Sequence, residues 1–342
     1  MFGDFEAQRH WLEITTNLKM SDWYRQTADN DLLYWGLDYP PLTAYASWVF
    51  GKIAEVAVPE LVALKASRGI ETANTKKFMR ISVLVCDYFI LIPSILWLVN
   101  FYYNRNRSSA TPLSIVYFRL SALLSPALLL IDHGHFQYNG VSIGLTLLST
   151  LAILEDYDVL GSILFCLALN YKQMILYYSL VIFIVLLRKI WRQRSIMAKL
   201  VKLFQIGFTV VITFAVMWLP LCISPPEGIE LSVGSCVDSL MRVLLRCFPF
   251  SRGIFEDKVS NIWYILSVLY DFRGSVSPDL VVKASAILTD TPVSVPYNVG
   301  IVFLGWQFLD KTIDDMSDSD ARTMLRKVGI ETPDLANLLP TR

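Results

Sequence analysis

The sequence carries little charge and no surplus of either sign. Charged residues make up 18% of its 342 residues, and 30 Lys and Arg balance 30 Asp and Glu. A chain without a basic excess offers no polyanion-binding surface, so nucleic acid is excluded as a partner. Internal repeats and low-complexity tracts are also absent. What remains to be explained is the apolar part of the chain and the polar residues set within it.

Cysteine and histidine are too few and too scattered to predict a metal site. The five cysteines contain no CxxC pair, and only His133 and His135 lie close together among the three histidines. We therefore expect no metal. Cys236 and Cys247 flank a polar loop and are candidates for a disulfide in an oxidising compartment, although the sequence leaves that pairing open.

Long apolar runs dominate the sequence. Hydrophobic residues make up 54% of the chain and the mean hydropathy is +0.46, which is too apolar for a soluble globule of this size. The runs are residues 78–104, 113–131, 139–154, 159–170, 174–187 and 203–223. The apolar part of the first run approaches the roughly 20 residues that a helix needs to span a bilayer. The sequence thus predicts an all-α, polytopic membrane protein.

Basic residues cluster in two connections between these runs. The first cluster lies at residues 105–107, and the second consists of Arg188, Lys189, Arg192, Arg194, Lys199 and Lys202. The positive-inside rule puts both in the cytosol, and the four apolar runs between them agree with that. The same parity puts residues 1–77, 132–138 and 171–173, and the loop after Ile223, on the opposite side of the membrane.

This topology divides the chain into five parts. We expect a first loop with amphipathic helices and the catalytic motif at 1–77, a bundle of membrane helices at 78–223, a second loop at 224–261, weak membrane segments at 262–309, and a polar tail at 310–342. The mixed charges of RGIFEDKVSNIW, in the second loop, are typical of a solvated surface.

The stretch GDFEAQRHW predicts the start of an amphipathic helix that runs from Asp4. Its apolar stripe consists of Ala7, Trp11, Ile14 and Leu18, and its polar face of Glu6, Arg9, His10 and Glu13. Asp4 follows Gly3 and suits the N-cap of this helix. A catalytic carboxylate is the alternative role for Asp4.

The stretch YWGLDYPPLTAY combines aromatic residues with two prolines. Pro40 and Pro41 disfavour helix in the residues before them and predict a helix that starts at Pro41. Asp38 lies just ahead of that start, where it either caps the helix or hydrogen-bonds a sugar hydroxyl. Tyr39 and its aromatic neighbours suit a sugar site or a membrane interface.

Two polar segments, DHGHFQYN at 132–139 and NYKQM at 170–174, lie between apolar runs on the same predicted side of the membrane. Ionisable residues at this boundary cost free energy unless they are paired or hydrated, so DHGHFQYN predicts a functional site. Lys172 in the second segment either neutralises a phosphate or extends its ammonium to the lipid headgroups.

Six motifs occur in order between Phe2 and Tyr270, namely GDFEAQRHW, YWGLDYPPLTAY, SRGIE, DHGHFQYN, NYKQM and RGIFEDKVSNIW. In this combination the chain resembles the endoplasmic reticulum alpha-1,3-glucosyltransferases that use dolichyl-phosphate glucose, a family of GT-C type. Members that add the first and the second glucose share the LDYPP and HFQYN cores. GDFEAQRHW, the WGLDYPPLTAY context and NYKQM fit the first-glucose members better.

The resemblance implies an all-helical, multi-pass enzyme of the endoplasmic reticulum membrane with its active site in luminal loops. Its substrates would be dolichyl-phosphate glucose and a dolichyl-diphosphate oligosaccharide, bound from the membrane lipid and without a cofactor. By motif match, Asp4 would be the general base. A β-linked glucosyl phosphate that becomes an α-glucoside inverts at the anomeric carbon, so one base suffices and the phosphate leaves without a general acid.

The other predicted site residues would bind the substrates. Arg9, Arg68 and Lys172 are the cations available to phosphate, and His135, Gln137 and Tyr138 are expected to line the donor path. The predicted substrate-binding set also includes Glu6, Asp38, Tyr39 and Gln173.

The resemblance also implies a transmembrane helix ahead of GDFEAQRHW and further spans with an HEK-containing motif at the other end. We therefore expect a chain that is shortened at both ends. The alternatives are a second-glucose transferase of the same family, a catalytically inactive membrane protein that binds dolichyl lipids, and a transporter. A transporter should place polar residues at mid-span, whereas here they cluster at one membrane face.

Overall fold

The computed structural model describes residues 3–105, 111–248 and Leu280. In these ranges the chain is helical throughout, with turns between helices and no strand, which confirms the all-α prediction. The chain divides into two units, of which the first is Met1–Leu180 with Ile190–Phe248. In the second unit, the described residues are Val181–Lys189, which form part of a helix, and Leu280. All contacts given below lie within the first unit.

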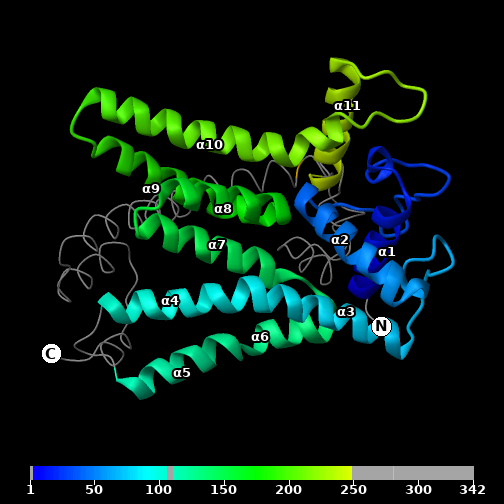
Figure 1. The fold of residues 1–342 in the computed structure, drawn as a ribbon, viewed down its shortest axis with the longest axis horizontal. Helices are drawn as coiled ribbons and strands as arrows, with labels where there is room; N and C mark the ends of the chain where they lie inside the picture. Colours follow the sequence, from blue (N-terminus) through cyan, green and yellow to red (C-terminus); the bar gives the residue numbers. More distant parts are fainter. Residues whose placement is uncertain (1–2, 106–110, 249–279, 281–342) are drawn as a thin grey trace. The chain divides into compact units, whose positions relative to one another are not determined.

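The helices follow the predicted apolar runs and amphipathic stretches in chain order (Figure 1). They are α1 (Gly3–Asn17), η1 (Met20–Asp22), α2 (Pro41–Ala57), η2 (Pro59–Leu61), α3 (Ala73–Cys86), η3 (Asp87–Leu91), α4 (Ile92–Arg105), α5 (Pro112–Leu123), α6 (Pro126–Leu128), η4 (Leu129–Phe136), α7 (Asn139–Leu154), α8 (Asp158–Tyr171), η5 (Gln173–Tyr178), α9 (Ser179–Trp191), α10 (Ile196–Cys222) and α11 (Val233–Cys247). The start of α2 at Pro41 is as predicted. The predicted segments at 262–309 and 310–342, and the motif RGIFEDKVSNIW, lie outside the described residues, Leu280 excepted.

Among the described residues, three helical stretches are long and apolar enough to cross a membrane, namely Ala73–Arg105, Gln173–Trp191 and Ile196–Cys222. The shorter apolar helices are Pro112–Leu123, Asn139–Leu154 and Asp158–Tyr171. The predicted apolar run at 113–131 is not a single helix, because α5 ends at Leu123 and the backbone leaves helical geometry at Ser125, where ψ is 120°. Pro126 explains the break, since a proline disfavours helical geometry in the residue before it.

Helices α7 and α8 form an antiparallel pair, with α4 against α7 and α10 against α8 (Figure 1). Small residues allow the close approach: a Cβ at Gly161 would lie 3.0 Å from the carbonyl oxygen of Ser149. The Ser149 hydroxyl in turn donates to the Gly161 carbonyl at 2.7 Å. Small residues and hydroxyl groups at helix contacts are typical of packing in membranes, where no hydrophobic difference drives helices together.

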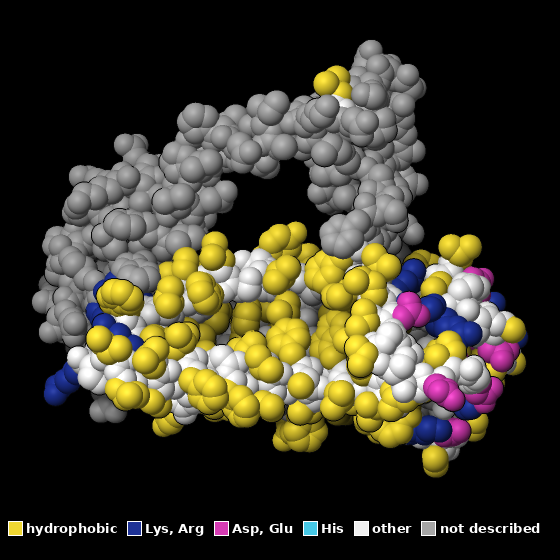
Figure 2. All heavy atoms as spheres, turned by 90° about the horizontal axis from the view of Figure 1, so that it is seen from above, with side chains coloured by type: hydrophobic (Ala, Val, Ile, Leu, Met, Phe, Trp, Pro, Cys, Tyr) yellow, Lys and Arg dark blue, Asp and Glu magenta, His cyan; other side chains and the backbone are white. Residues whose placement is uncertain are grey.

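The two ends of this bundle differ in composition. Helices α1, α2 and α11 lie at one end, hereafter the α1 end, and α4 ends and α10 begins at the opposite end (Figure 1). Figure 2 shows hydrophobic side chains over the middle, acidic and basic side chains together at the α1 end, and Lys and Arg at the other. The charged side chains of the described helices thus gather at the two ends, with the apolar side chains between them.

The α1 end has a hydrophobic core of its own. It joins residues of α1, the YWGLDYPPLTAY segment, α10 and α11, and its buried members are Trp11, Ile14, Trp23, Tyr24, Leu37, Ala44, Leu221, Val243 and Cys247. Burial of large aromatic side chains gives this core much of its stability. The core holds the polar motifs of the first 40 residues against the ends of the membrane helices.

A disulfide joins Cys222, the last residue of α10, to Cys236 in the first turn of α11, with Cα atoms 4.4 Å apart. The pairing of Cys236 with Cys247 considered from the sequence is therefore wrong. Cys247 is a buried free thiol in the core of the α1 end. The spacing of the cysteines in the sequence did not reveal this pair. Cys222 and Cys236 come together because the chain turns between α10 and α11.

Candidate functional site

Asp4, His135 and Gln137 meet at the α1 end. The Nε2 atoms of His135 and Gln137 both approach Oδ2 of Asp4, each at 2.7 Å. The Asp4 and His135 side chains are 34% and 45% exposed, so the carboxylate remains accessible. Helix α1 begins at Gly3, so Asp4 lies inside its first turn and the N-cap expectation is wrong. An accessible carboxylate held by two donors can accept a proton in a defined direction.

The backbone of η4 explains how His135 and Gln137 reach the same carboxylate. This π-helix ends at Phe136, whose φ is 81°, and Gln137 is extended. A positive φ is unfavourable for a bulky residue and persists only where the surroundings enforce it. The Phe136 ring is buried, with edge contacts to Phe5 at 5.3 Å and Tyr138 at 5.5 Å. Packing of this ring thus fixes the turn that directs its two neighbours toward Asp4.

A second group centres on Lys172. Its ammonium donates to Oδ1 of Asn139, and the Asn139 amide donates to Oδ1 of Asp132 at 2.8 Å. Asp132 is buried and also accepts from the Gly140 backbone N–H at 2.7 Å. Burial lowers the pKa of Lys172, whereas the negative charges of Asp132, Asp4 and Asp38 raise it in part. The result is a partly desolvated cation surrounded by carboxylates.

A small pocket lies between these two groups. It is lined by Gln8, Tyr39, Thr43, Gln137, Tyr138, Tyr171 and Lys172. Four of these, namely Tyr39, Gln137, Tyr138 and Lys172, are residues predicted from the sequence. The Lys172 ammonium lies 5.3 Å from the centre of the Tyr39 ring, and burial raises the pKa of that tyrosine. The empty volume of the pocket, about 200 Å³, is smaller than the roughly 300 Å³ or more of ordinary ligand pockets, so its walls are close together.

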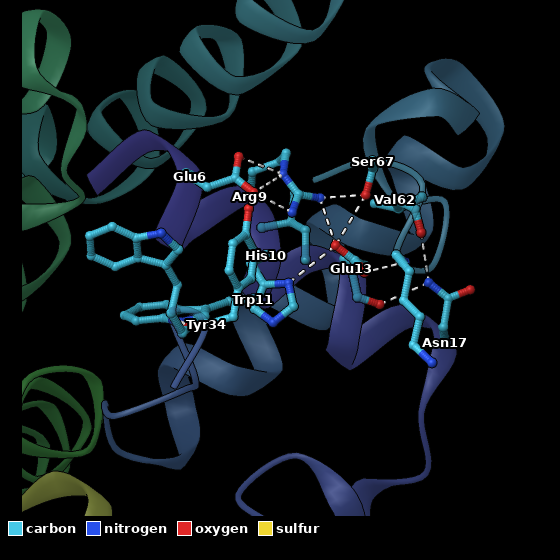
Figure 3. Close-up of polar contacts among 12 residues, drawn as sticks. Glu6, Arg9, His10, Trp11, Glu13, Asn17, Tyr34, Val62 and Ser67 are labelled. Carbon is cyan, nitrogen blue, oxygen red and sulfur yellow. Dashed lines mark hydrogen bonds and ion pairs between the residues drawn. The ribbon is translucent and has the colours of Figure 1, made fainter. Parts of the chain in front are cut away.

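Arg9 is fully buried and belongs to a different network (Figure 3). Its guanidinium binds Glu6 through two nitrogens and donates to Glu13 at 2.8 Å, to the Leu61 carbonyl at 3.2 Å and to the Ser67 hydroxyl. Although burial raises the pKa of Glu13, hydrogen bonds from His10 and from the Lys65 backbone and the Arg9 charge lower it to about 2. Arg9 thus ties α1 to residues 61–67, and we no longer propose it as a phosphate ligand.

Glu6 also serves this network rather than the pocket. Its Oε1 accepts from the Tyr34 hydroxyl at 2.8 Å and from the Gly69 backbone N–H at 3.1 Å. Arg68 lies over the Tyr34 ring, with its guanidinium carbon 4.4 Å from the ring centre. The arrangement gives Glu6 a positioning role, and Arg68 is a half-buried cation beside it.

Asp38 and Gln173 precede or follow lining residues of the pocket in the chain but do not line it themselves. The α2 N-cap position is Pro40, so Asp38, two residues earlier, does not occupy the N-cap position of that helix. Gln173 Nε2 donates to the carbonyls of Asp38 and Cys247, each at 3.3 Å. Gln173 therefore links three segments of the chain, and Asp38 contributes its negative charge to the surroundings of Lys172.

Asp87 was not predicted from the sequence, yet it lies beside the site. Its Oδ2 pairs with His133 Nε2 at 2.9 Å from within η3, a π-helical turn in the first long apolar stretch. A single carboxylate inside an apolar run was the available signal, because such a residue needs a partner in the membrane. Within the described ranges, no three His, Cys, Asp or Glu side chains gather in a way that could hold a metal ion.

Comparisons with known proteins point to one family. Residues 1–301 match the model of the ALG6, ALG8 glycosyltransferase family. The chain is 47% identical over 289 residues to the "Dolichyl pyrophosphate Man9GlcNAc2 alpha-1,3-glucosyltransferase" of Gallus gallus, which covers 84% of this chain and 54% of that protein. A protein of that name from Mus musculus is 43% identical over 290 residues, with the same two shares. The "Probable dolichyl pyrophosphate Man9GlcNAc2 alpha-1,3-glucosyltransferase" of Dictyostelium discoideum is 45% identical over 293 residues, 84% of this chain and 53% of that protein. The chain thus spans about half the length of the curated relatives it matches.

Proposed function

Because the chain belongs to the ALG6, ALG8 glycosyltransferase family, we propose that it is an inverting glucosyltransferase that adds the first alpha-1,3-glucose to the mannose-rich dolichyl-diphosphate oligosaccharide. The donor is dolichyl-phosphate glucose. The observation that carries this proposal is the accessible Asp4 carboxylate, held by His135 and Gln137 beside a pocket that contains Lys172. The names of the relatives support the reaction and the oligosaccharide.

In the proposed reaction Asp4 is the general base. The acceptor hydroxyl oxygen forms a bond to the anomeric carbon, and the bond from that carbon to the phosphate oxygen breaks with its electron pair going to the phosphate. Asp4 takes the hydroxyl proton. Both contacts recorded for its carboxylate in the described part of the chain are at Oδ2, so we assign Oδ1 to the acceptor. Such base catalysis is worth about 10²- to 10⁴-fold in rate.

Lys172 is the proposed partner of the donor phosphate. Its charge neutralises the phosphate as it leaves, and a desolvated ammonium does this better than a hydrated one. Tyr39 and Tyr138 form the aromatic walls against which the glucosyl group lies, and Gln137 orients the base. Arg68 remains the second proposed cation, and the displacement requires neither a metal nor a cofactor.

We place the α1 end in the lumen of the endoplasmic reticulum. The basic connections at the other end favour the cytosol by the positive-inside rule. The disulfide between Cys222 and Cys236 supports an oxidising compartment for the α1 end. The two lipid-linked substrates then approach the site from the membrane.

Glucose transfer measured in membranes without the endogenous enzyme tests the proposal. The 342-residue chain, its Asp4→Asn variant and the matched control Glu55→Gln, an exposed carboxylate of α2, are compared at equal expression. We expect transfer by the parent chain and the control and a loss of at least about 100-fold in Asp4→Asn. Full transfer by Asp4→Asn would contradict the base assignment. No transfer by the parent chain, beside an active full-length relative, would favour the alternative of a protein that binds dolichyl lipids without turnover.

A further inference from the structure

We propose that α11 lies in the membrane–water boundary at the α1 end, with one apolar stripe in contact with lipid. The stripe consists of Val233, Val237, Met241 and Leu244. This inference concerns the surface of the protein and does not depend on glucosyl transfer.

The four stripe residues share one face of the helix. Their spacing of four, four and three residues places them above one another along α11. Their side chains are 82%, 53%, 48% and 39% exposed, respectively. Large apolar side chains gathered on one exposed helix face mark a contact surface rather than a solvated one.

The charged residues of α11 lie on a different face of the helix from the stripe. Asp238 and Arg242, one turn apart, form an exposed ion pair of 2.6 Å. An apolar stripe and a charged face on the same helix are typical of helices that lie along a lipid surface, with the charges toward the headgroups and water.

The orientation of α11 about its own axis is fixed by a third set of residues. Val243 and Cys247 are buried in the core of the α1 end. Arg246 donates to the carbonyls of Leu37 at 3.1 Å and Gly36 at 2.9 Å. Because these contacts hold one side of the helix against the protein, α11 cannot rotate to bury the stripe.

The depth of α11 follows from its link to α10. Helix α10 is one of the stretches long enough to cross a membrane, and its last two turns expose Val216 and Leu219. The disulfide between Cys222 and Cys236 holds the first turn of α11 at the level where α10 ends. Figure 1 shows α11 crossing the end of α10 rather than continuing it. The exposed stripe thus lies at the level where the apolar helix α10 ends, and this position identifies the bilayer as its occupant.

Photocrosslinking of the full chain in phosphatidylcholine vesicles tests this placement. A benzophenone amino acid is introduced singly at Val237, at Met241 and, as the matched polar-face control, at Arg242. The adducts are identified by mass after irradiation, and retention of the Cys222–Cys236 disulfide confirms that each variant is folded.

We expect several-fold more phospholipid adduct at Val237 and Met241 than at Arg242. Crosslinks from both stripe positions to another segment of the chain would overturn the proposal, because that segment would then cover the stripe. Equal lipid adduct at all three positions would overturn it as well, since α11 would have no oriented contact with the bilayer.

Discussion

Oδ2 of Asp4 and Nε2 of His135 lie 2.7 Å apart, which joins the first turn of α1 to the end of η4. The same oxygen accepts a hydrogen bond from Gln137. Two motifs that are distant in the sequence therefore form one unit around a single carboxylate oxygen. The chemistry of the proposed site depends on that junction.

Replacement of Gln137 by glutamate tests how this unit controls Asp4. A second carboxylate beside Oδ2 would share a proton with Asp4, because two like charges at hydrogen-bond distance repel each other. The acid limb of the glucose-transfer rate should therefore move to higher pH by about one unit or more. The measurement is the pH profile of transfer for Gln137→Glu and for the neutral control Gln137→Met. The same acid limb in both variants would show that Gln137 does not act through Asp4.

Asp132 is expected to keep Lys172 charged through Asn139. Burial lowers the pKa of Lys172, and Asp132 is the strongest of the charges that oppose this, ahead of Asp4 and Asp38. Asp132→Asn removes that support and lowers the pKa of Lys172 further, so binding of dolichyl phosphate should fail at a lower pH than in the parent chain. The measurement is dolichyl phosphate binding against pH.

The control for this experiment is Lys172→Met, which should bind weakly and without the alkaline decline. Asp4, Asp38, Asn139 and Tyr39, which face the ammonium from other segments, stay unchanged. An alkaline midpoint that is identical in Asp132→Asn and the parent chain would contradict the role of Asp132.

The buried Arg9 network should contribute strongly to stability. Arg9→Met removes the buried cation that pairs with Glu13, which costs about 3–5 kcal/mol. The matched control is Lys52→Met, which removes an exposed ion pair with Glu55 and should cost at most about 1 kcal/mol. Unfolding by denaturant in detergent micelles measures both. Equal losses of unfolding free energy in the two variants would show that the buried ion pairs of Arg9 stabilise the fold no more than an exposed ion pair does.

The same network predicts how stability depends on pH. The pKa of Glu13 is lowered from 4.5 to about 2 in the folded chain. The contribution of Glu13 to the free energy of unfolding is therefore complete above pH 4.5, the pKa of the unfolded chain, and is lost as the pH falls from 4.5 toward about 2. Glu13→Gln should flatten this part of the stability profile, measured by the denaturant midpoint at a series of pH values. An unchanged acid profile would contradict the assignment.

Gly140 should be sensitive to the smallest side chain. A Cβ at Gly140 would lie 2.2 Å from Oδ1 of Asp87, so Gly140→Ala must displace Asp87 and disturb its pair with His133. We expect a loss of about 1–3 kcal/mol in the free energy of unfolding. Gly207 in α10 has nothing within 4 Å of the same position, and Gly207→Ala should change stability by no more than about 1 kcal/mol. Equal effects of the two substitutions would argue against a close packing of Gly140 on Asp87.

Much of the architecture follows from local sequence. The apolar runs mark the membrane helices because apolar length is a local property, and Pro41 marks the start of α2 because proline fixes its own backbone angle. Pro126 is an equally local signal, and it marks the break between α5 and α6 within the apolar run at 113–131. The motifs also identified the residue types of the site, such as the carboxylate of Asp4 and the ammonium of Lys172.

Only the tertiary structure decided which of these residues share a site. Arg9 and Lys172 are both cations in polar motifs, yet one is enclosed by Glu6 and Glu13 and the other lies in a pocket wall. The same holds for the cysteines, where the turn after α10 and not sequence separation selects Cys222 as the partner of Cys236. The sequence by itself determined the helices, the apolar spans and the chemical inventory, because these depend on neighbours along the chain. Burial and pairing depend on segments brought together by folding, and these alone separate a structural charge from one that can meet a substrate.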